Sequence, residues 1–374
     1  MSFIYNFMLV VLLVSSILEV YGGSEEKPSK QWFYSIVVLM MLTAGLAYGL
    51  SPDWVAYWNA FEGASVTSLF ELPLLAEAVD MEFGYMLLNK IVSSIGLGYA
   101  SFTLIIAVIA LYLKSTTIYE YGGYVFLALM MYFVPIYFFE EHVHVRQGLA
   151  NAIMIYSVRF IIERKLYKFL LCFVIAFLFH KAVVAFLLAY WVVKIRFNNT
   201  TIITIVMVAV IANAAGLSSV IDGVMQFMPF GVAETYNDYA NESIEASILG
   251  DIVKVITVLV MLAFNKQAEE NDEYFAYFRN IYIFGVVMYF FFGNSIFGSR
   301  LPVFYTVYLV FVVPRMIKAL QHNAFFKNVV YIGFTTYTLL LYINFYNNWG
   351  DKSGFGSYTT SLNKWVPYSF FQSF

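Results

Sequence analysis

Four ionisable side chains lie in or beside apolar stretches of this sequence, where they are costly. Arg146 opens one stretch and Arg300 precedes another. His180 and Lys181 interrupt a third. Charges inside a membrane usually face a partner or a water-filled cavity, so they mark functional sites. Arginine offers paired donors to a phosphate, lysine a point charge, and histidine a base that works near neutral pH. These residue types suit an anionic ligand and proton transfer.

Polar residues surround Arg146 at helical spacing. On one continuous helix, His142 would share a face with Arg146, and Gln147 would share one with Asn151. The functional hypothesis is a cationic, hydrogen-bonding wall at the outer leaflet that binds an anionic ligand.

Each of these side chains also has an ordinary structural explanation. Arg146 could reach the lipid headgroups and pair with Glu140 or Glu141. His180 could be a buried ring that hydrogen-bonds a backbone carbonyl. The residues alone leave these alternatives open.

Carboxylates and aromatic rings gather in an earlier segment. Asp53 is followed by Tyr57, and Glu82 begins the sequence Glu-Phe-Gly-Tyr that ends at Tyr85. This combination suits sugar binding, because carboxylates accept hydrogen bonds from hydroxyls and rings give flat apolar contact. A solvated acidic loop with interfacial aromatic residues is the alternative.

The elements that position these residues must be apolar. Hydrophobic residues make up 61% of the 374 residues and charged ones 12%, against roughly 25% charged in soluble domains. The mean hydropathy is +0.74. A soluble chain this apolar could not hide its surface from water. We predict an all-α, polytopic transmembrane protein that forms a single membrane domain over 1–374.

Crossing about 30 Å of hydrocarbon takes about 20 mostly apolar residues. The segments that meet or approach this length are 2–22, 32–51, 98–115, 123–140, 145–163, 200–221, 249–265, 280–297, 301–318 and 328–346. Segment 169–193 could also cross once, but both of its flanks are basic. We expect it to form a membrane-embedded hairpin of two short helices that turns at 179–181. An ordinary single span is the alternative.

Lysine and arginine collect in alternate connections, and cytoplasmic loops carry such an excess. The basic positions are Lys27, Lys30, Lys114, Arg164, Lys165, Lys168, Lys194, Arg196, Lys266, Arg279, Arg315, Lys318 and Lys327. Loops 51–82 and 222–248 contain neither residue type and are acidic. We therefore place these two loops and the tail 347–374 outside the cytoplasm.

Several classes of function are disfavoured. A single cysteine cannot form an intramolecular disulfide, and four histidines argue against a histidine-rich metal centre. Phosphate-cradling and dinucleotide-binding motifs do not occur in the sequence. Basic residues are too few and too scattered for nucleic acid. We expect neither a metal nor a cofactor.

The polar residues follow a known pattern. Its marks are Asp53 with Tyr57, the Glu82–Tyr85 sequence, Val-Arg-Gln-Gly-Leu-Ala from Val145 to Ala150, the apolar segment around His180, and Arg300. In order and spacing, residues 50–305 resemble the EpsG/Wzy-like family of bacterial polysaccharide polymerases. The arginine motif followed by the histidine segment is the most specific part. Phe83 and Lys181 depart from the pattern, which more often has proline and serine there.

The resemblance implies a metal-independent glycosyltransferase that polymerises lipid-linked repeat units of O-antigen lipopolysaccharide or an exopolysaccharide. Its donor and acceptor would be undecaprenyl-pyrophosphate-linked glycans, at the periplasmic face of the bacterial inner membrane. A chain-length regulator protein is a candidate partner, besides membrane lipid.

The candidate residues fit that chemistry as a hypothesis. Arg146 and Arg300 would hold the pyrophosphate, because fixed cations in a low-dielectric site stabilise a leaving anion. The general base would be His180, Glu82 or Asp53. Further substrate contacts would come from Tyr85, His142, Gln147, Asn151 and Lys181.

Other functions remain open. A lipid-linked oligosaccharide flippase or small-solute transporter would explain the many spans and the broken helix, although no inverted repeat is visible. A membrane O-acyltransferase would also use an intramembrane histidine. A polysaccharide ligase has closely related chemistry and differs in joining polymer to a lipid core.

Overall fold

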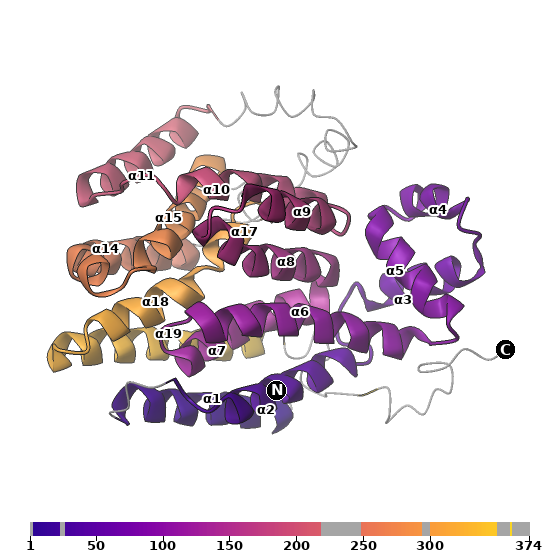
Figure 1. The fold of residues 1–374 in the computed structure, drawn as a ribbon, viewed down its shortest axis with the longest axis horizontal. Helices are drawn as coiled ribbons and strands as arrows, with labels where there is room; N and C mark the ends of the chain where they lie inside the picture. Colours follow the sequence, from indigo (N-terminus) through magenta and orange to yellow (C-terminus); the bar gives the residue numbers. More distant parts are fainter. Residues whose placement is uncertain (1–2, 23–26, 218–247, 294–299, 350–359, 361–374) are drawn as a thin grey trace. The chain divides into compact units, whose positions relative to one another are not determined.

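The computed structural model describes residues 3–22, 27–217, 248–293, 300–349 and 360 (Figure 1). Every secondary-structure element of more than one residue in this part of the chain is a helix, which confirms the all-α prediction. The external loop predicted at 222–248, apart from its last residue, and nearly all of the tail after 349 lie outside the described residues.

Helices long and apolar enough to cross a membrane number four among the described residues. They are α1 (Phe3–Tyr21), α6 (Tyr99–Tyr121), α15 (Phe275–Phe292) and α19 (Ala324–Trp349). On α1, Val10 and Leu18 are 57% and 66% exposed. Apolar surface of this kind is stable against lipid, so the membrane assignment stands. The larger count of spans from the sequence stays a prediction.

The described chain forms two compact units. The first contains residues 1–160, 167–180 and 331–374, and the second contains 161–166 and 181–330. The prediction of one membrane domain stays a prediction.

In the first unit, α1 packs on α7 (Val125–Tyr132) and α2 (Lys30–Gly45) packs on α6. Gly45 allows the second contact, since a Cβ there would lie 2.6 Å from the Cα of Leu104. At the start of α7, Glu19 accepts hydrogen bonds from the backbone N–H groups of Val125 and Phe126 at 2.6 and 2.8 Å. A carboxylate at this end of a helix satisfies unpaired donors and complements the helix dipole.

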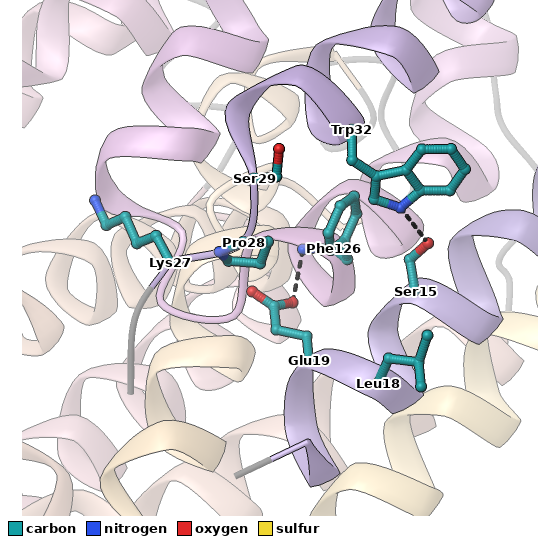
Figure 2. A pocket seen from close by; sticks show the side chains of 8 residues that line it. All are labelled: Ser15, Leu18, Glu19, Lys27, Pro28, Ser29, Trp32 and Phe126. Atoms are coloured by element: carbon teal, nitrogen blue, oxygen red, sulfur yellow. Dashed lines mark hydrogen bonds between the residues drawn. The ribbon is translucent and has the colours of Figure 1, made fainter. Parts of the chain in front are cut away.

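A cavity of about 380 Å³ lies beside this helix start (Figure 2). It is lined by Ser15, Leu18, Glu19, Lys27, Pro28, Ser29, Trp32 and Phe126. The polar groups that line it already have partners, such as the Ser15 hydroxyl, which accepts from the Trp32 indole at 3.1 Å. The predicted site residues lie elsewhere.

The predicted loop 51–82 is largely helical. It contains α3 (Trp54–Val66) and α4 (Leu72–Ala78), and α5 (Phe83–Ser94) follows directly. Four of its six acidic residues lie just before or between these helices, and two lie on them. Pro73 falls in the first turn of α4, where proline is tolerated. The membrane side of this segment stays a prediction.

The predicted span 123–140 is not one continuous α-helix. After α7 the helix is broken within η1 (Phe133–Tyr137), where the backbone of Val134 is extended, and a π-helical turn, η2 (Phe139–Val143), follows. Pro135 lies in η1 and supplies no N–H for regular helical bonding. Helix α8 (Val145–Ile162) begins only after η2.

The sequence led us to expect Lys114 in a connection between helices, but it lies within a helix. Helix α6 continues past it to Tyr121, and its side chain is 1% exposed and paired with Glu140 and Glu141. Three polar residues directly follow Lys114, so the apolar run ends there although the helix continues. Lys114 therefore contributes nothing to the orientation argument, which rests on the other basic positions.

The helix break predicted near His180 falls where expected. Helix α9 (Leu166–Phe177) ends before it, and the 3₁₀ helix η3 (Lys181–Leu188) begins after it, followed by α10 (Ala189–Val192). The two arms belong to different units, and the hairpin itself stays a prediction.

In the second unit, α15 packs on α11 (Asn199–Ala214), α17 (Val303–Thr306) and α18 (Leu309–Ala319). The buried Arg279 pairs with the exposed Glu269. A buried ion pair joins Arg315 of α18 to Asp272, which lies between α14 (Ile248–Asn271) and α15. These arginines are satisfied by protein partners and are structural.

Candidate functional site

The centre of the site is the Glu82 carboxylate, which lies between a histidine and an arginine. Its Oε1 hydrogen-bonds to Nδ1 of His180 at 3.1 Å, and its Oε2 forms an ion pair with Arg146. The side chains of Glu82, Arg146 and His180 are 10%, 21% and 12% exposed. Three residues that are far apart in the sequence thus form one partly buried chain of charges and hydrogen bonds.

Gly84 brings His180 to Glu82. Its backbone N–H donates to the carbonyl of Leu178 at 2.9 Å. A Cβ on Gly84 would lie 2.6 Å from that carbonyl oxygen, so only glycine permits the start of α5 to meet the end of α9. Glu82 directly precedes α5 in an extended conformation, and His180 lies three residues after the last residue of α9. The glycine of the Glu-Phe-Gly-Tyr sequence therefore has a geometric role.

Substituting Gly84 tests that role. We expect Gly84→Ala to separate the start of α5 from Leu178 and to loosen the Glu82–His180 contact, because the added methyl group meets a backbone atom. Overpacking of this kind costs roughly 1–3 kcal/mol. The thermal midpoint of the purified protein should fall. Gly63→Ala is the control, since its Cβ would meet the nearest side-chain atom at 3.5 Å. An unchanged midpoint in Gly84→Ala would contradict the close contact.

Arg146 is the second residue of α8, and it reaches back over the α3–α5 region. Its Nη1 also donates to the Asp80 carbonyl at 3.2 Å, and its guanidinium carbon lies 5.9 Å from the Tyr57 ring centroid. Its buried Nε has no hydrogen-bond partner among the residues that the structure describes. A buried donor without a partner costs about 1–3 kcal/mol. A bound anion would remove that cost.

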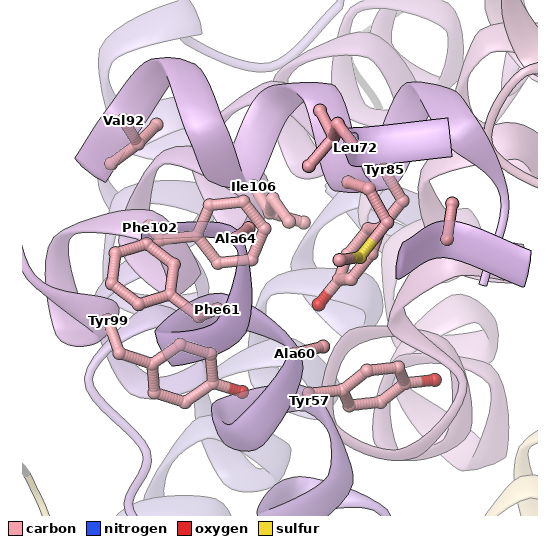
Figure 3. Packing of buried hydrophobic residues seen from close by; sticks show 12 residues of the cluster. Tyr57, Ala60, Phe61, Ala64, Leu72, Tyr85, Val92, Tyr99, Phe102 and Ile106 are labelled. Atoms are coloured by element: carbon pink, nitrogen blue, oxygen red, sulfur yellow. The ribbon is translucent and has the colours of Figure 1, made fainter. Parts of the chain in front are cut away.

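A cluster of buried, largely aromatic side chains lies next to the site (Figure 3). The ring centroid of Tyr85 lies 5.6 Å from that of Tyr57 and 5.4 Å from that of Phe102. Val145 and Phe179 pack against the same cluster. Each of these is the direct sequence neighbour of a site residue, Arg146 or His180. The cluster therefore holds the start of α8 and the end of α9 together.

Electrostatics set the state of Glu82. Burial alone would raise the pKa of this carboxyl, but the hydrogen bond from His180 and the positive charge of Arg146 outweigh it and lower the pKa from 4.5 to about 2. Glu82 is thus ionised at neutral pH and is a weak base. It can instead orient the imidazole through Nδ1, which leaves Nε2 as the ring nitrogen not held by Glu82.

The pKa of Glu82 predicts how stability depends on pH. Because the folded pKa of about 2 lies below 4.5, the interaction is fully present above about pH 5 and is lost as pH falls towards 2. At neutral pH the shift corresponds to about 3 kcal/mol. We expect Glu82→Gln to have a lower thermal midpoint than the wild type at pH 7, with the difference shrinking below pH 4.5. A constant difference from pH 7 to pH 3 would contradict this assignment.

The structure brings only some of the predicted site residues together. Tyr85 is 1% exposed, so its ring is buried within the aromatic cluster. Gln147 follows Arg146 on α8 and is 8% exposed. Asp53 directly precedes α3, one helical turn before Tyr57. It is not part of the Glu82–Arg146–His180 chain of contacts.

The expected helical face shared by His142 and Arg146 was wrong. Helix α8 begins at Val145, so His142 belongs to the preceding turn η2. Its Nε2 hydrogen-bonds to the Tyr5 hydroxyl at 3.0 Å. Asn151 does lie on α8, where its Nδ2 donates to Oε1 of Glu140 at 2.6 Å. The geometry thus gives His142 and Asn151 protein partners, and their substrate roles stay predictions.

Lys181 and Arg300 belong to the second unit, whereas Arg146 belongs to the first. Lys181 begins η3, and Arg300 is the first described residue before α17. The hypothesis that Arg146 and Arg300 share one pocket stays a prediction.

The sequence did not reveal how Arg146 is paired. It suggested Glu140 or Glu141 as partners, yet the ion pair forms with Glu82. The Leu178 and Asp80 carbonyls were also missed, because backbone groups leave no trace in residue types. The one available signal was the Glu-Phe-Gly-Tyr sequence, whose glycine marks a close approach.

In this helical membrane protein a histidine and an arginine both contact one carboxylate, and the three form a partly buried charged centre. The family model of the EpsG family matches residues 30–370, and the chain belongs to this family. The resemblance noted from the sequence is thereby confirmed. No curated protein and no solved structure matches the chain. Membership supports a polysaccharide polymerase-like function.

Proposed function

We propose that this protein joins lipid-pyrophosphate-linked oligosaccharide repeat units by glycosyl transfer on the outer face of the bacterial inner membrane. The observation that carries the proposal is the Glu82 carboxylate in contact with both His180 and Arg146. This arrangement offers a base and a fixed cation in one place. Family membership supports a polysaccharide polymerase-like function.

The reaction needs both groups. The acceptor hydroxyl oxygen bonds to the anomeric carbon of the donor sugar, and the bond from that carbon to the pyrophosphate oxygen breaks. His180 takes the hydroxyl proton at Nε2. The lipid pyrophosphate leaves with the bonding electron pair, and Arg146 stabilises the added negative charge. A preorganised cation in a site of low dielectric is an efficient stabiliser of such charge.

Glu82 serves both partners without reacting. It holds the His180 ring in one orientation and fixes the guanidinium of Arg146 against Tyr57. The aromatic residues of α3 contact the sugars, and undecaprenyl is the lipid carrier.

Reconstitution tests the proposed class. Purified full-length protein in detergent is given lipid-linked repeat units extracted from the producing strain. We expect products of two or more units, together with released lipid pyrophosphate, and no need for a nucleotide sugar. Units that cross vesicle membranes without being joined would favour a transporter, and acyl transfer at constant glycan length would favour an acyltransferase. Either result would overturn the proposal.

A further inference from the structure

A second charged cluster is buried in the first unit. The Lys114 ammonium on α6 lies 2.7 Å from Oε2 of Glu140 and 2.5 Å from Oε1 of Glu141. The three side chains are 1%, 3% and 2% exposed. None of them is part of the Glu82–Arg146–His180 chain, so the proposed reaction leaves their purpose open.

The cluster connects four elements. Besides the ion pairs to Lys114, the Tyr132 hydroxyl of α7 donates to Oε1 of Glu141 at 2.5 Å. The Asn151 amide of α8 donates to Oε1 of Glu140 at 2.6 Å. Turn η2, which carries both carboxylates, is thereby tied to α6, α7 and α8.

The segment held in this way is one whose backbone is irregular. The backbone of Val134 is extended and breaks the helix at η1, and η2 is a π-helical turn, a rare form that concentrates at functional sites. Gly148 brings α8 into backbone contact with η2, because a Cβ there would lie 2.1 Å from the Glu140 carbonyl oxygen. The start of α8 is therefore placed by η2, and Arg146 lies within that first turn.

We propose that Lys114, with Glu140 and Glu141, is a positioning cluster that sets the location of Arg146 opposite Glu82. The inference rests on the proposed function in one respect, which is that a pyrophosphate is the ligand of Arg146. Directional hydrogen bonds fix a geometry, whereas apolar side chains of similar volume would give equal or greater stability. A buried ionic cluster at this place is thus explained by the position it imposes on α8.

A double-mutant cycle tests this inference. Farnesyl pyrophosphate binding is measured with the purified full-length protein for Lys114→Met, Arg146→Ala and the double variant. We expect each single change to weaken binding roughly tenfold or more, and the double variant to bind no more weakly than Arg146→Ala. Such non-additivity is the signature of residues that act through one another. Additive losses would overturn the proposal.

Three further variants separate positioning from general stability. Lys114→Arg keeps the charge and should recover much of the binding. Ser16→Ala breaks the buried hydrogen bond of 3.1 Å to Tyr331 in the same unit, and should lower the thermal midpoint without changing binding. Should Lys114→Met yield too little folded protein, Asn151→Ala replaces it in the same cycle, since it removes only the tie from Glu140 to α8.

The outcomes distinguish the two proposals. Wild-type binding in Arg146→Ala would remove the proposed function of that arginine. Weakened binding in Arg146→Ala together with wild-type binding in folded Lys114→Met or Asn151→Ala would leave the function standing and remove the positioning role.

Discussion

Replacing His180 with alanine should abolish polymer formation while single lipid-linked units accumulate and the protein remains abundant. The imidazole is the group that removes the acceptor proton, and general-base catalysis contributes about 10²–10⁴-fold to a rate. Turnover by the purified variant should fall by a similar factor. Binding of the lipid pyrophosphate should change little, because Arg146 keeps its partner Glu82.

The matched control is His322→Ala. His322 lies in an exposed connection after α18, where its nearest polar contact is the neighbouring Gln321 at 3.4 Å, and its removal should leave polymer length unchanged. Long polymer of normal abundance from His180→Ala would contradict the assignment of the base. The same result in Glu82→Gln would contradict the idea that this carboxylate orients the ring.

Individual site residues could be predicted from the sequence because each is a charged or polar residue in or beside an apolar segment. Arg146 and His180 lie in apolar surroundings, and buried charges seldom occur without a function. Glu82 was found as part of a short motif. Their mutual contacts could not be predicted, since these depend on where α8 begins. A helix break at Val134 and the π-turn η2 precede the start of α8 at Val145, and a helical spacing rule detects neither of them.

The fold shows the same division. Long apolar runs became α1, α6, α15 and α19, because apolar length is a local property of the chain. Lys114 was misplaced because a lysine that ends an apolar run and is followed by polar residues can be either a loop residue or the centre of a buried ion cluster. Only the distant carboxylates Glu140 and Glu141 decide between the two. A charged residue in the sequence is therefore a poor marker of a loop wherever a distant residue of opposite charge can neutralise it.

Arg146→Ala should reduce turnover by roughly 10²–10³-fold, the usual effect of removing one preorganised donor to a developing negative charge. It should also lower stability, because it leaves the Glu82 carboxylate partly buried and without its cation. Removing one partner of a buried pair costs about 3–5 kcal/mol, and the 21% exposure of Arg146 places this pair at or below the lower end. The loss of activity and the loss of stability must therefore be separated.

The double variant Arg146→Ala, Glu82→Gln makes that separation. Removing the carboxylate charge should restore much of the thermal midpoint, because a neutral amide costs less to bury without a cation. Turnover should stay low, since no guanidinium faces the leaving pyrophosphate. Arg159→Ala on the same helix is the control, as its ion pair to Glu120 is 3.4 Å long and partly exposed. Recovery of wild-type turnover in the double variant would show that Arg146 only neutralises Glu82, and the pyrophosphate would then have to be bound by other cations.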